Sequence, residues 1–247
     1  MSGHSKWSTI KRKKEKTDGA RAKVFTKIGR EIAVAVREGG PDPAGNSKLK
    51  DVIAKAKANN VPNDNIERII KKAAGETGGA AYEEIIYEGY GPNGIAVVVK
   101  ALTDNRNRTA GDVRHYFDKF GGNMGTSGCV MFMFDYYGVI VIEKEDVDEE
   151  KLMEDALEAG ATDLLTDDEE VFEIRTEPND LGAITNDLSA KGYKFVSSET
   201  AYIPQTYTRL DDQEAMKNMS KMLDMFDEND DIQGVWHNWE NEDEYEG

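Results

Sequence analysis

The spacing of apolar residues predicts helices in the first 75 residues of the chain. Apolar side chains recur there at every third or fourth position, which places them on one face of a helix. Asp18 can cap a first helix, a second begins near Ser47, and a third follows Pro62. The expected inward-facing residues are Phe25, Ile28, Ile32, Ala35, Val36, Leu49, Val52, Ile53, Ala56, Ile66, Ile69 and Ile70. The pattern therefore predicts a small three-helix bundle with lysines on its polar faces.

The apolar period changes from helical to alternating after a glycine-rich linker at residues 75–80. The expected elements are strands at 82–88 and 94–102, a helix at 109–120, a tight glycine-rich turn at 121–128 and a strand at 129–134. The last expected elements are a short strand after Pro204, a helix at 212–226 and a strand at 232–239. Since these last segments have no sheet of their own, we expect them to complete the sheet that begins at residue 82.

Between these two parts, strand and helix patterns follow each other regularly. The expected strands occupy 139–143, 162–166, 171–175 and 194–203, and the expected helices occupy 149–159 and 179–190. This β-α-β-β-α-β order is that of the ferredoxin-like unit. The predicted fold class is therefore α+β. Its predicted parts are an N-terminal three-helix bundle at 1–75, a middle α/β sandwich-like domain at 80–135 plus 204–240, and an inserted ferredoxin-like β-α-β-β-α-β domain at 136–203.

The charge of the chain is divided between its two ends. The net charge is −17, yet residues 1–74 hold 18 of the 31 Lys and Arg and only 8 of the 48 Asp and Glu. The first part therefore carries +10 and the remainder −27. A basic module on an acidic body is typical of proteins that bind nucleic acid at one end. The alternative is a charged surface that only keeps the protein soluble.

The strongest candidate binding site is the basic arm that precedes the first helix. It contains Lys6, Trp7, Lys11, Arg12, Lys13, Lys14 and Lys16. Phosphates require dense positive charge, and an exposed indole can stack on an unpaired base. Arg21 and Lys23 extend the site onto the first helix. Because the arm has few side chains suited to reading base edges, we expect contacts mainly to the nucleic-acid backbone. In the alternative interpretation the arm is a solvated tail and Trp7 packs on the bundle.

A second candidate lies at a strand-to-helix junction and contains Arg106 and Arg108. Backbone N–H groups at the start of a helix attract anions, and two arginines beside them would strengthen a phosphate site. In the alternative interpretation Asn105 is an ordinary helix cap, and the arginines pair with the acidic body.

No pattern in the sequence indicates catalysis, a cofactor or a metal. Cys129 opens an apolar segment and is interpreted as part of the core, and the 3 histidines are scattered. Asp227, Asn229 and Asp231 resemble the start of a calcium-binding loop, but the glycine and glutamate that such a loop needs are missing. We therefore expect a protein that is not an enzyme and has no cofactor or metal site. The single cysteine, the lack of a signal-peptide pattern and the short apolar runs predict a cytoplasmic protein with no membrane partner.

Several motifs resemble those of the YebC/PmpR family, in the same order. They are Gly3-His4-Ser5-Lys6-Trp7, Asp18-Gly19-Ala20-Arg21, Tyr87-Glu88-Gly89-Tyr90-Gly91-Pro92, Thr103-Asp104-Asn105-Arg106-Asn107-Arg108-Thr109 and Gly121-Gly122-Asn123. The resemblance covers essentially the whole chain and implies a three-domain nucleic-acid binder. Members of the family are described as DNA-binding transcriptional regulators, mitochondrial relatives as translational activators, and some bacterial members are linked to the ribosome.

Two main functions follow from the charge pattern and the resemblance. One is a DNA-binding transcriptional regulator, the usual description of the family. The other is a regulator of translation that binds ribosomal RNA, with ribosomal proteins as further partners. A lone basic end joined to a body of −27 suits a structured RNA–protein particle better than duplex DNA, so we favour the second. A protein–protein adaptor is the third interpretation.

Overall fold

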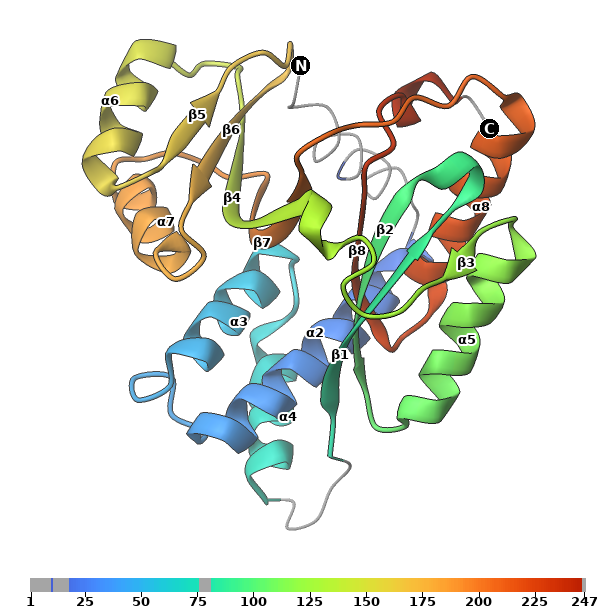
Figure 1. Ribbon diagram of the computed structural model, residues 1–247. Coiled ribbons are helices and arrows are strands. Elements are labelled where there is room, and N and C mark those ends of the chain that lie inside the picture. The colour runs from blue at the N-terminus through green and yellow to red at the C-terminus, as the bar shows by residue number, and fades with distance from the viewer. Residues whose placement is uncertain (1–9, 11–17, 76–80, 246–247) are drawn as a thin grey trace.

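A computed structural model of the protein describes residue 10, residues 18–75 and residues 81–245. The N-terminal helices are α2 (Asp18–Gly39), α3 (Ser47–Ala58) and α4 (Asn63–Gly75), and they lie together at one end of the molecule (Figure 1). Two four-stranded antiparallel sheets with their own helices follow. The predicted fold class, α+β with a helical N-terminal part, is confirmed.

The N-terminal helices pack through the apolar stripe that the spacing predicts. Ile28 and Ile32 of α2 are buried with Leu49 of α3 and Ile66 of α4. Asn46 fixes the start of α3, since its side-chain oxygen accepts the N–H of Leu49 at 3.0 Å. The lysines and arginines of the three helices lie mostly on the faces that are not buried.

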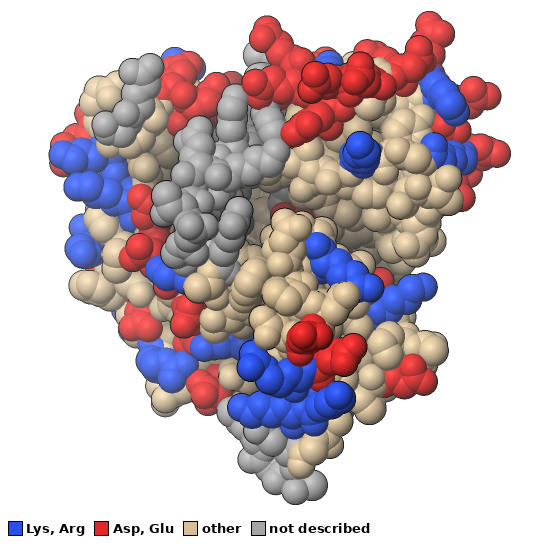
Figure 2. All heavy atoms as spheres, turned by 180° about the vertical axis from the view of Figure 1, so that it is seen from behind, with Lys and Arg blue, Asp and Glu red and all other residues tan. Residues whose placement is uncertain are grey.

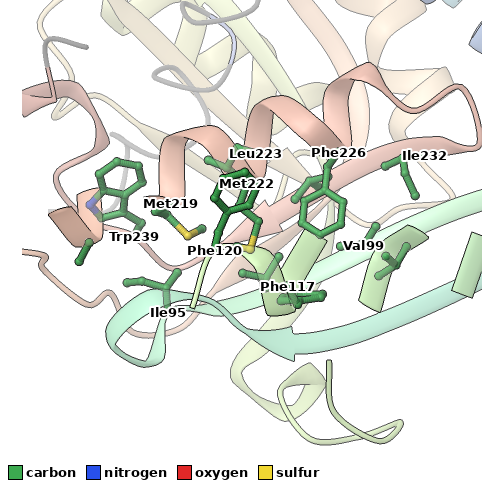
Figure 3. Packing of buried hydrophobic residues seen from close by; sticks show 14 of the residues in the cluster. Ile95, Val99, Phe117, Phe120, Met219, Met222, Leu223, Phe226, Ile232 and Trp239 are labelled. Carbon is green, nitrogen blue, oxygen red and sulfur yellow. The ribbon is translucent and has the colours of Figure 1, made fainter. Parts of the chain in front are cut away.

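The middle sheet has the strand order β3-β1-β2-β8. Its strands are β1 (Glu83–Tyr90), β2 (Ala96–Thr103), β3 (Asn123–Met124) and β8 (Ile232–His237). Helices α5 (Arg106–Lys119) and α8 (Gln213–Glu228) cover one face of this sheet. Figure 3 shows how Phe117 of α5 and Phe226 of α8 pack over Val99 of β2, and all three side chains are fully buried. This core thus contains residues from 95–120 and from 210–239, which lie far apart in the sequence.

The second sheet has the strand order β5-β6-β4-β7. Its strands are β4 (Phe134–Glu143), β5 (Asp163–Leu165), β6 (Val171–Thr176) and β7 (Ser197–Pro204). Helices α6 (Glu149–Ala159) and α7 (Leu181–Ala190) pack on one face, where Leu152 and Ile184 meet Ile140. The elements thus follow each other as β-α-β-β-α-β along the chain. We call residues 134–204, which include these strands and helices, the acidic unit.

Three details of the predicted secondary structure are wrong. Residues 129–134 do not form a separate strand: Met131–Met133 is a 3₁₀-helix, and β4 runs unbroken from Phe134. The glycine-rich turn at 121–128 contains the short strand β3, which pairs with β1. The short strand predicted between Pro204 and the next helix is not formed: this described segment makes only an isolated bridge, between Thr208 and Trp239.

Glu88 explains why the apolar run after Gly128 is not a strand. Its buried carboxylate accepts the backbone N–H groups of Gly128, Val130 and Met131 at 2.6, 2.9 and 2.8 Å. Backbone donors that bind a carboxylate cannot also join a strand ladder. Burial alone would raise the pKa of Glu88, but these three hydrogen bonds hold it below its ordinary value. Cys129 therefore lies in a turn, half-buried, where burial raises the pKa of its thiol.

We expect the acidic unit to fold cooperatively on its own. Phe134 at the start of β4 pairs with Pro204 at the end of β7, so the ends of residues 134–204 are adjacent. The unit also has its own buried cluster between the sheet and its two helices. A fragment of these residues should give a mixed helix and strand spectrum by circular dichroism and a single thermal transition. A fragment that stays unfolded would contradict the division of residues 80–240 into a middle domain and an inserted domain.

Candidate nucleic-acid interface

Most of the predicted basic arm lies outside the described residues. This applies to Lys6, Trp7, Lys11, Arg12, Lys13, Lys14 and Lys16, and to the side chain of Arg21. Within the described part, the half-buried Ile10 packs against the apolar cluster that includes Val141 and Ala201, on the face of the acidic unit opposite its helices. The role of the arm therefore stays a prediction.

The described N-terminal helices carry further positive charge. Their exposed basic residues are Arg37, Lys48, Lys50, Lys57, Arg68, Lys71 and Lys72. Figure 2 shows the largest group of Lys and Arg on this face near the lower end of the molecule, where Figure 1 places α4. The densest group of Asp and Glu lies along the upper edge. Among the described residues, the basic side chains of the helices and the densest group of carboxylates are thus separated in space.

Some of these cations are held in exposed ion pairs. Lys48 lies 2.7 Å from Glu38, and Lys71 lies 4.0 Å from Glu67. The predicted site residue Lys23 lies 3.8 Å from Glu228 of α8, and both side chains are well exposed. Exposed pairs of this kind contribute on the order of 0–1 kcal/mol, so a phosphate can replace the carboxylate at little cost.

Lys55 differs from the other lysines of α2, α3 and α4, which we call the helical unit. It points into a cleft of about 970 Å³ that is lined by the helical unit, the middle sheet and the acidic unit. Its ammonium group lies 2.7 Å from Glu31. Burial lowers the pKa of Lys55, but the charges of Glu31 and Glu199 outweigh burial and raise it. Lys55 is therefore a charged internal partner rather than a phosphate contact.

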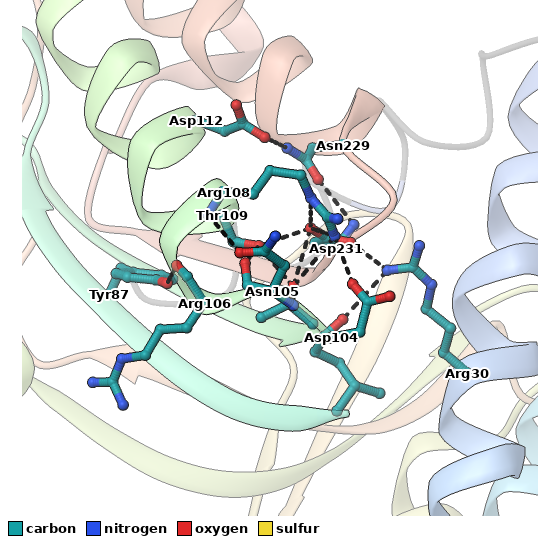
Figure 4. Close-up of polar contacts among 12 residues, drawn as sticks. Arg30, Tyr87, Asp104, Asn105, Arg106, Arg108, Thr109, Asp112, Asn229 and Asp231 are labelled. Carbon is teal, nitrogen blue, oxygen red and sulfur yellow. Dashed lines mark hydrogen bonds and ion pairs between the residues drawn. The ribbon is translucent and has the colours of Figure 1, made fainter. Parts of the chain in front are cut away.

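The structure separates the two arginines of the second candidate. Helix α5 begins at Arg106, three residues before the predicted start, and Asn105 caps it by accepting the N–H of Arg108 at 3.1 Å. The Arg106 side chain is 67% exposed, points away from the neighbouring polar cluster, and lies 3.8 Å from Glu83 (Figure 4). The guanidinium of Arg108 instead lies 2.8 Å from Asp231 and 2.9 Å from Asp104. Only Arg106 is thus placed to meet a phosphate freely.

Asp231 is the centre of the polar cluster in Figure 4. Its side chain is only 5% exposed, and it pairs with Arg108 of α5 and with Arg30 of α2. The hydroxyls of Thr109 and Thr103 donate to it at 2.7 and 3.3 Å. Since Arg30 belongs to the helical unit, this carboxylate joins that unit to the middle sheet.

Sequence reasoning missed the role of Asp231. The residue stands out in the sequence only as part of an incomplete calcium-loop pattern. Its partners Arg108 and Arg30 lie 123 and 201 positions away, so no local pattern reveals the cluster. The one available signal is an acidic residue directly before the apolar strand β8.

Two features of the described residues bear on a metal site and on a membrane span. Among them, no group of three or more His, Cys, Asp or Glu side chains is arranged to hold a metal ion. In the same part of the chain, every helix is too short or too polar to cross a membrane.

We expect replacement of Asp231 by asparagine to remove a pH-dependent part of the stability. Burial alone would raise the pKa of Asp231, but hydrogen bonds from Arg108, Arg30 and Thr109 lower it from 3.8 to about 2. Because the folded-state pKa is depressed, the stabilisation is complete above about pH 4 and is lost as the pH falls toward about 2. This shift corresponds to about 2 kcal/mol.

Denaturant unfolding between about pH 2 and pH 7 measures the difference. The free energy of unfolding of wild type should fall by this amount on acidification. That of Asp231→Asn should be lower at pH 7 and should fall less steeply. The neighbouring exposed Asp230, changed to asparagine, is the matched control and should follow wild type. If the free energy of unfolding depends on pH equally in wild type and in Asp231→Asn, the Asp231 carboxylate does not stabilise the fold.

Comparison with known proteins identifies relatives over the whole length of the chain. Residues 5–76 match the TACO1/YebC protein N-terminal domain, and residues 82–239 match the TACO1/YebC second and third domain. A protein of Acetivibrio thermocellus is 59% identical over 240 residues, which are 97% of this chain and 99% of that one. A protein of Ruminiclostridium cellulolyticum is 59% identical over 247 residues, which are 100% of this chain and 99% of that one. Both are named "Probable transcriptional regulatory protein".

A solved structure shows the same fold. The crystal structure of a conserved hypothetical protein of Aquifex aeolicus is 45% identical in sequence and superposes with a TM-score of 0.81. The match covers 91% of this chain and 92% of that chain. The resemblance suggested by the sequence motifs is therefore confirmed, and the chain belongs to the TACO1/YebC family.

Proposed function

We propose that this protein is a cytoplasmic, non-enzymatic regulator of translation that binds ribosomal RNA through its basic N-terminal end. The observation that carries the proposal is the spatial separation of charge. In the sequence the first 74 residues carry +10 and the rest carry −27. Among the described residues, the exposed Lys and Arg of the helices lie away from the densest group of carboxylates. The binding residues would be those of the arm, Arg21 and Lys23 on α2, and the exposed Arg106.

The acidic part of the molecule limits the kinds of nucleic acid that fit. Carboxylates gather along the edge opposite α4, so a duplex that follows the whole surface would meet repulsion. Such repulsion extends about one Debye length, roughly 8 Å at physiological ionic strength. Folded ribosomal RNA presents phosphates from several strands and unpaired bases at one place, which suits a compact basic end.

A DNA-binding transcriptional regulator is the second candidate. The names of the relatives favour it, and so does one structural feature. Helices α3 and α4 are joined by residues 59–62, a connection as short as that of a helix-turn-helix. In that arrangement α4 would enter the major groove, with Arg68 and Lys71 exposed on it.

We expect ribosomal RNA to compete short duplex DNA away from the protein at physiological salt. The arm offers charge and one indole, so scrambling the DNA sequence should change the affinity by less than the cost of one mismatch in a true operator, about 1–3 kcal/mol. Fluorescence anisotropy of labelled duplex DNA, with unlabelled 23S ribosomal RNA as competitor, measures both effects. One DNA sequence bound about a thousandfold better than scrambled DNA, and not displaced by the RNA, would favour the transcriptional regulator.

The same assay identifies the residues responsible. Neutralising the arm with Lys11→Ala, Arg12→Ala, Lys13→Ala and Lys14→Ala should weaken RNA binding. Four lost phosphate contacts should reduce the slope of log affinity against log salt by roughly three units. A variant with Lys217→Ala and Lys221→Ala, on α8, is the control that keeps the arm and removes positive charge elsewhere. Equal salt slopes for the arm variant and wild type would rule the arm out as the site.

A further inference from the structure

The outer face of α6 leaves two large apolar side chains in solvent. Met153 is 41% exposed and Leu157 is 60% exposed. Among the described residues, the other large apolar side chains exposed to this degree are Phe132 and Tyr136, which lie outside α6. The adjacent face of α6 carries the buried Leu152 and Ala156 and packs into the acidic unit. Figure 1 shows α6 at the outer edge of that unit, with α7 and the sheet on its other side.

The two apolar residues form a continuous patch. Residues four positions apart lie next to each other on the surface of a helix, so Met153 and Leu157 are neighbours. Glu150 and Glu154 precede them by three positions each and are exposed on the same side. The patch therefore has an apolar centre with carboxylates beside it.

The surroundings of the patch are strongly acidic. Residues 143–170 contain fourteen Asp and Glu and only two basic residues. Both basic side chains are engaged within the acidic unit, and so is Lys191, which follows α7 and lies 2.7 Å from Glu158 and 3.0 Å from Asp155. Lys144 donates to the carbonyl of Thr166 at 2.7 Å, and Lys151 lies 2.7 Å from the buried Asp155. Nucleic acid is thus repelled here, whereas a basic protein surface is attracted.

We propose that the outer face of α6 docks a basic, amphipathic helix of a partner protein. The apolar stripe of such a helix would cover Met153 and Leu157, and its flanking Lys or Arg would meet Glu150 and Glu154. This inference deepens the proposed function by adding a protein contact at the end of the molecule away from the basic helices. It uses none of the residues assigned to nucleic acid, so its test requires no RNA or DNA.

A synthetic helical peptide tests the proposal directly. The probe is a labelled 18-residue helix of Leu and Lys with Leu at every third or fourth position, and the comparison peptide has the same residues in scrambled order. Full-length protein should bind the amphipathic peptide more tightly than the scrambled one in an anisotropy titration. Hydrogen exchange should slow within α6 when the amphipathic peptide is bound.

Two sets of variants separate the apolar contribution from simple charge attraction. Met153→Ser with Leu157→Ser keeps every carboxylate and should weaken binding of the amphipathic peptide by about tenfold or more. Phe132→Ser removes an exposed apolar side chain elsewhere and should leave binding unchanged. Glu150→Gln with Glu154→Gln should weaken binding and reduce its dependence on salt.

Several results would overturn the proposal. One is a serine double variant that binds the amphipathic peptide as tightly as wild type, because attraction would then depend on charge alone. Another is slowed exchange at the acidic residues 240–244 instead of α6. A third is self-association of the protein through α6 in sedimentation, which would make a second copy the occupant of the patch. Thermal unfolding of each variant confirms that these exposed substitutions leave the fold intact.

Discussion

The carboxylate of Asp231 lies where the helical unit, the middle sheet and helix α5 meet, and their relative positions depend on its neutralisation. A buried charge is costly unless it is paired and hydrogen-bonded. Arg30 reaches it from α2, Arg108 reaches it from α5, and Thr109 completes its hydrogen bonds. The same contact explains why Arg108 differs from Arg106. The guanidinium of Arg108 pairs with the buried Asp231 carboxylate, whereas the exposed guanidinium of Arg106 can contact a ligand.

The ion pair between Arg30 and Asp231 holds α2 against the middle sheet and so positions the basic side chains of the helical unit. The lysines and arginines of the helices stay at one end, and the carboxylates of the acidic unit and of the last residues stay at the other. Each end then favours a different class of partner: nucleic acid at the basic end and, as we propose, a basic protein helix at α6. A protein with these two surfaces suits a particle built of RNA and basic proteins.

The sequence predicted the elements that are determined locally and missed those determined by distant side chains. The apolar spacing located the buried faces of α2, α3 and α4, and the β-α-β-β-α-β order of residues 134–204, because both depend on near neighbours. The strand predicted at 129–134 failed because Glu88, some forty positions earlier, binds the backbone donors of that segment. Asp231 escaped notice for the same reason, since both of its arginine partners lie more than a hundred positions away. The basic arm stays a prediction from charge alone, and its contacts cannot be inferred from the sequence because phosphate binding imposes no periodic pattern.

In the proposed function, nucleic acid binds only to the basic end of the molecule. Hydrogen–deuterium exchange of the full-length protein, with and without 23S ribosomal RNA at physiological salt, tests it most directly because it reports on every element at once. The account predicts that bound RNA slows exchange in the segment before α2 and in the helical unit, and leaves α6, α7 and α8 unchanged. Slowed exchange in α6 or α8, with none in the helical unit, would contradict it.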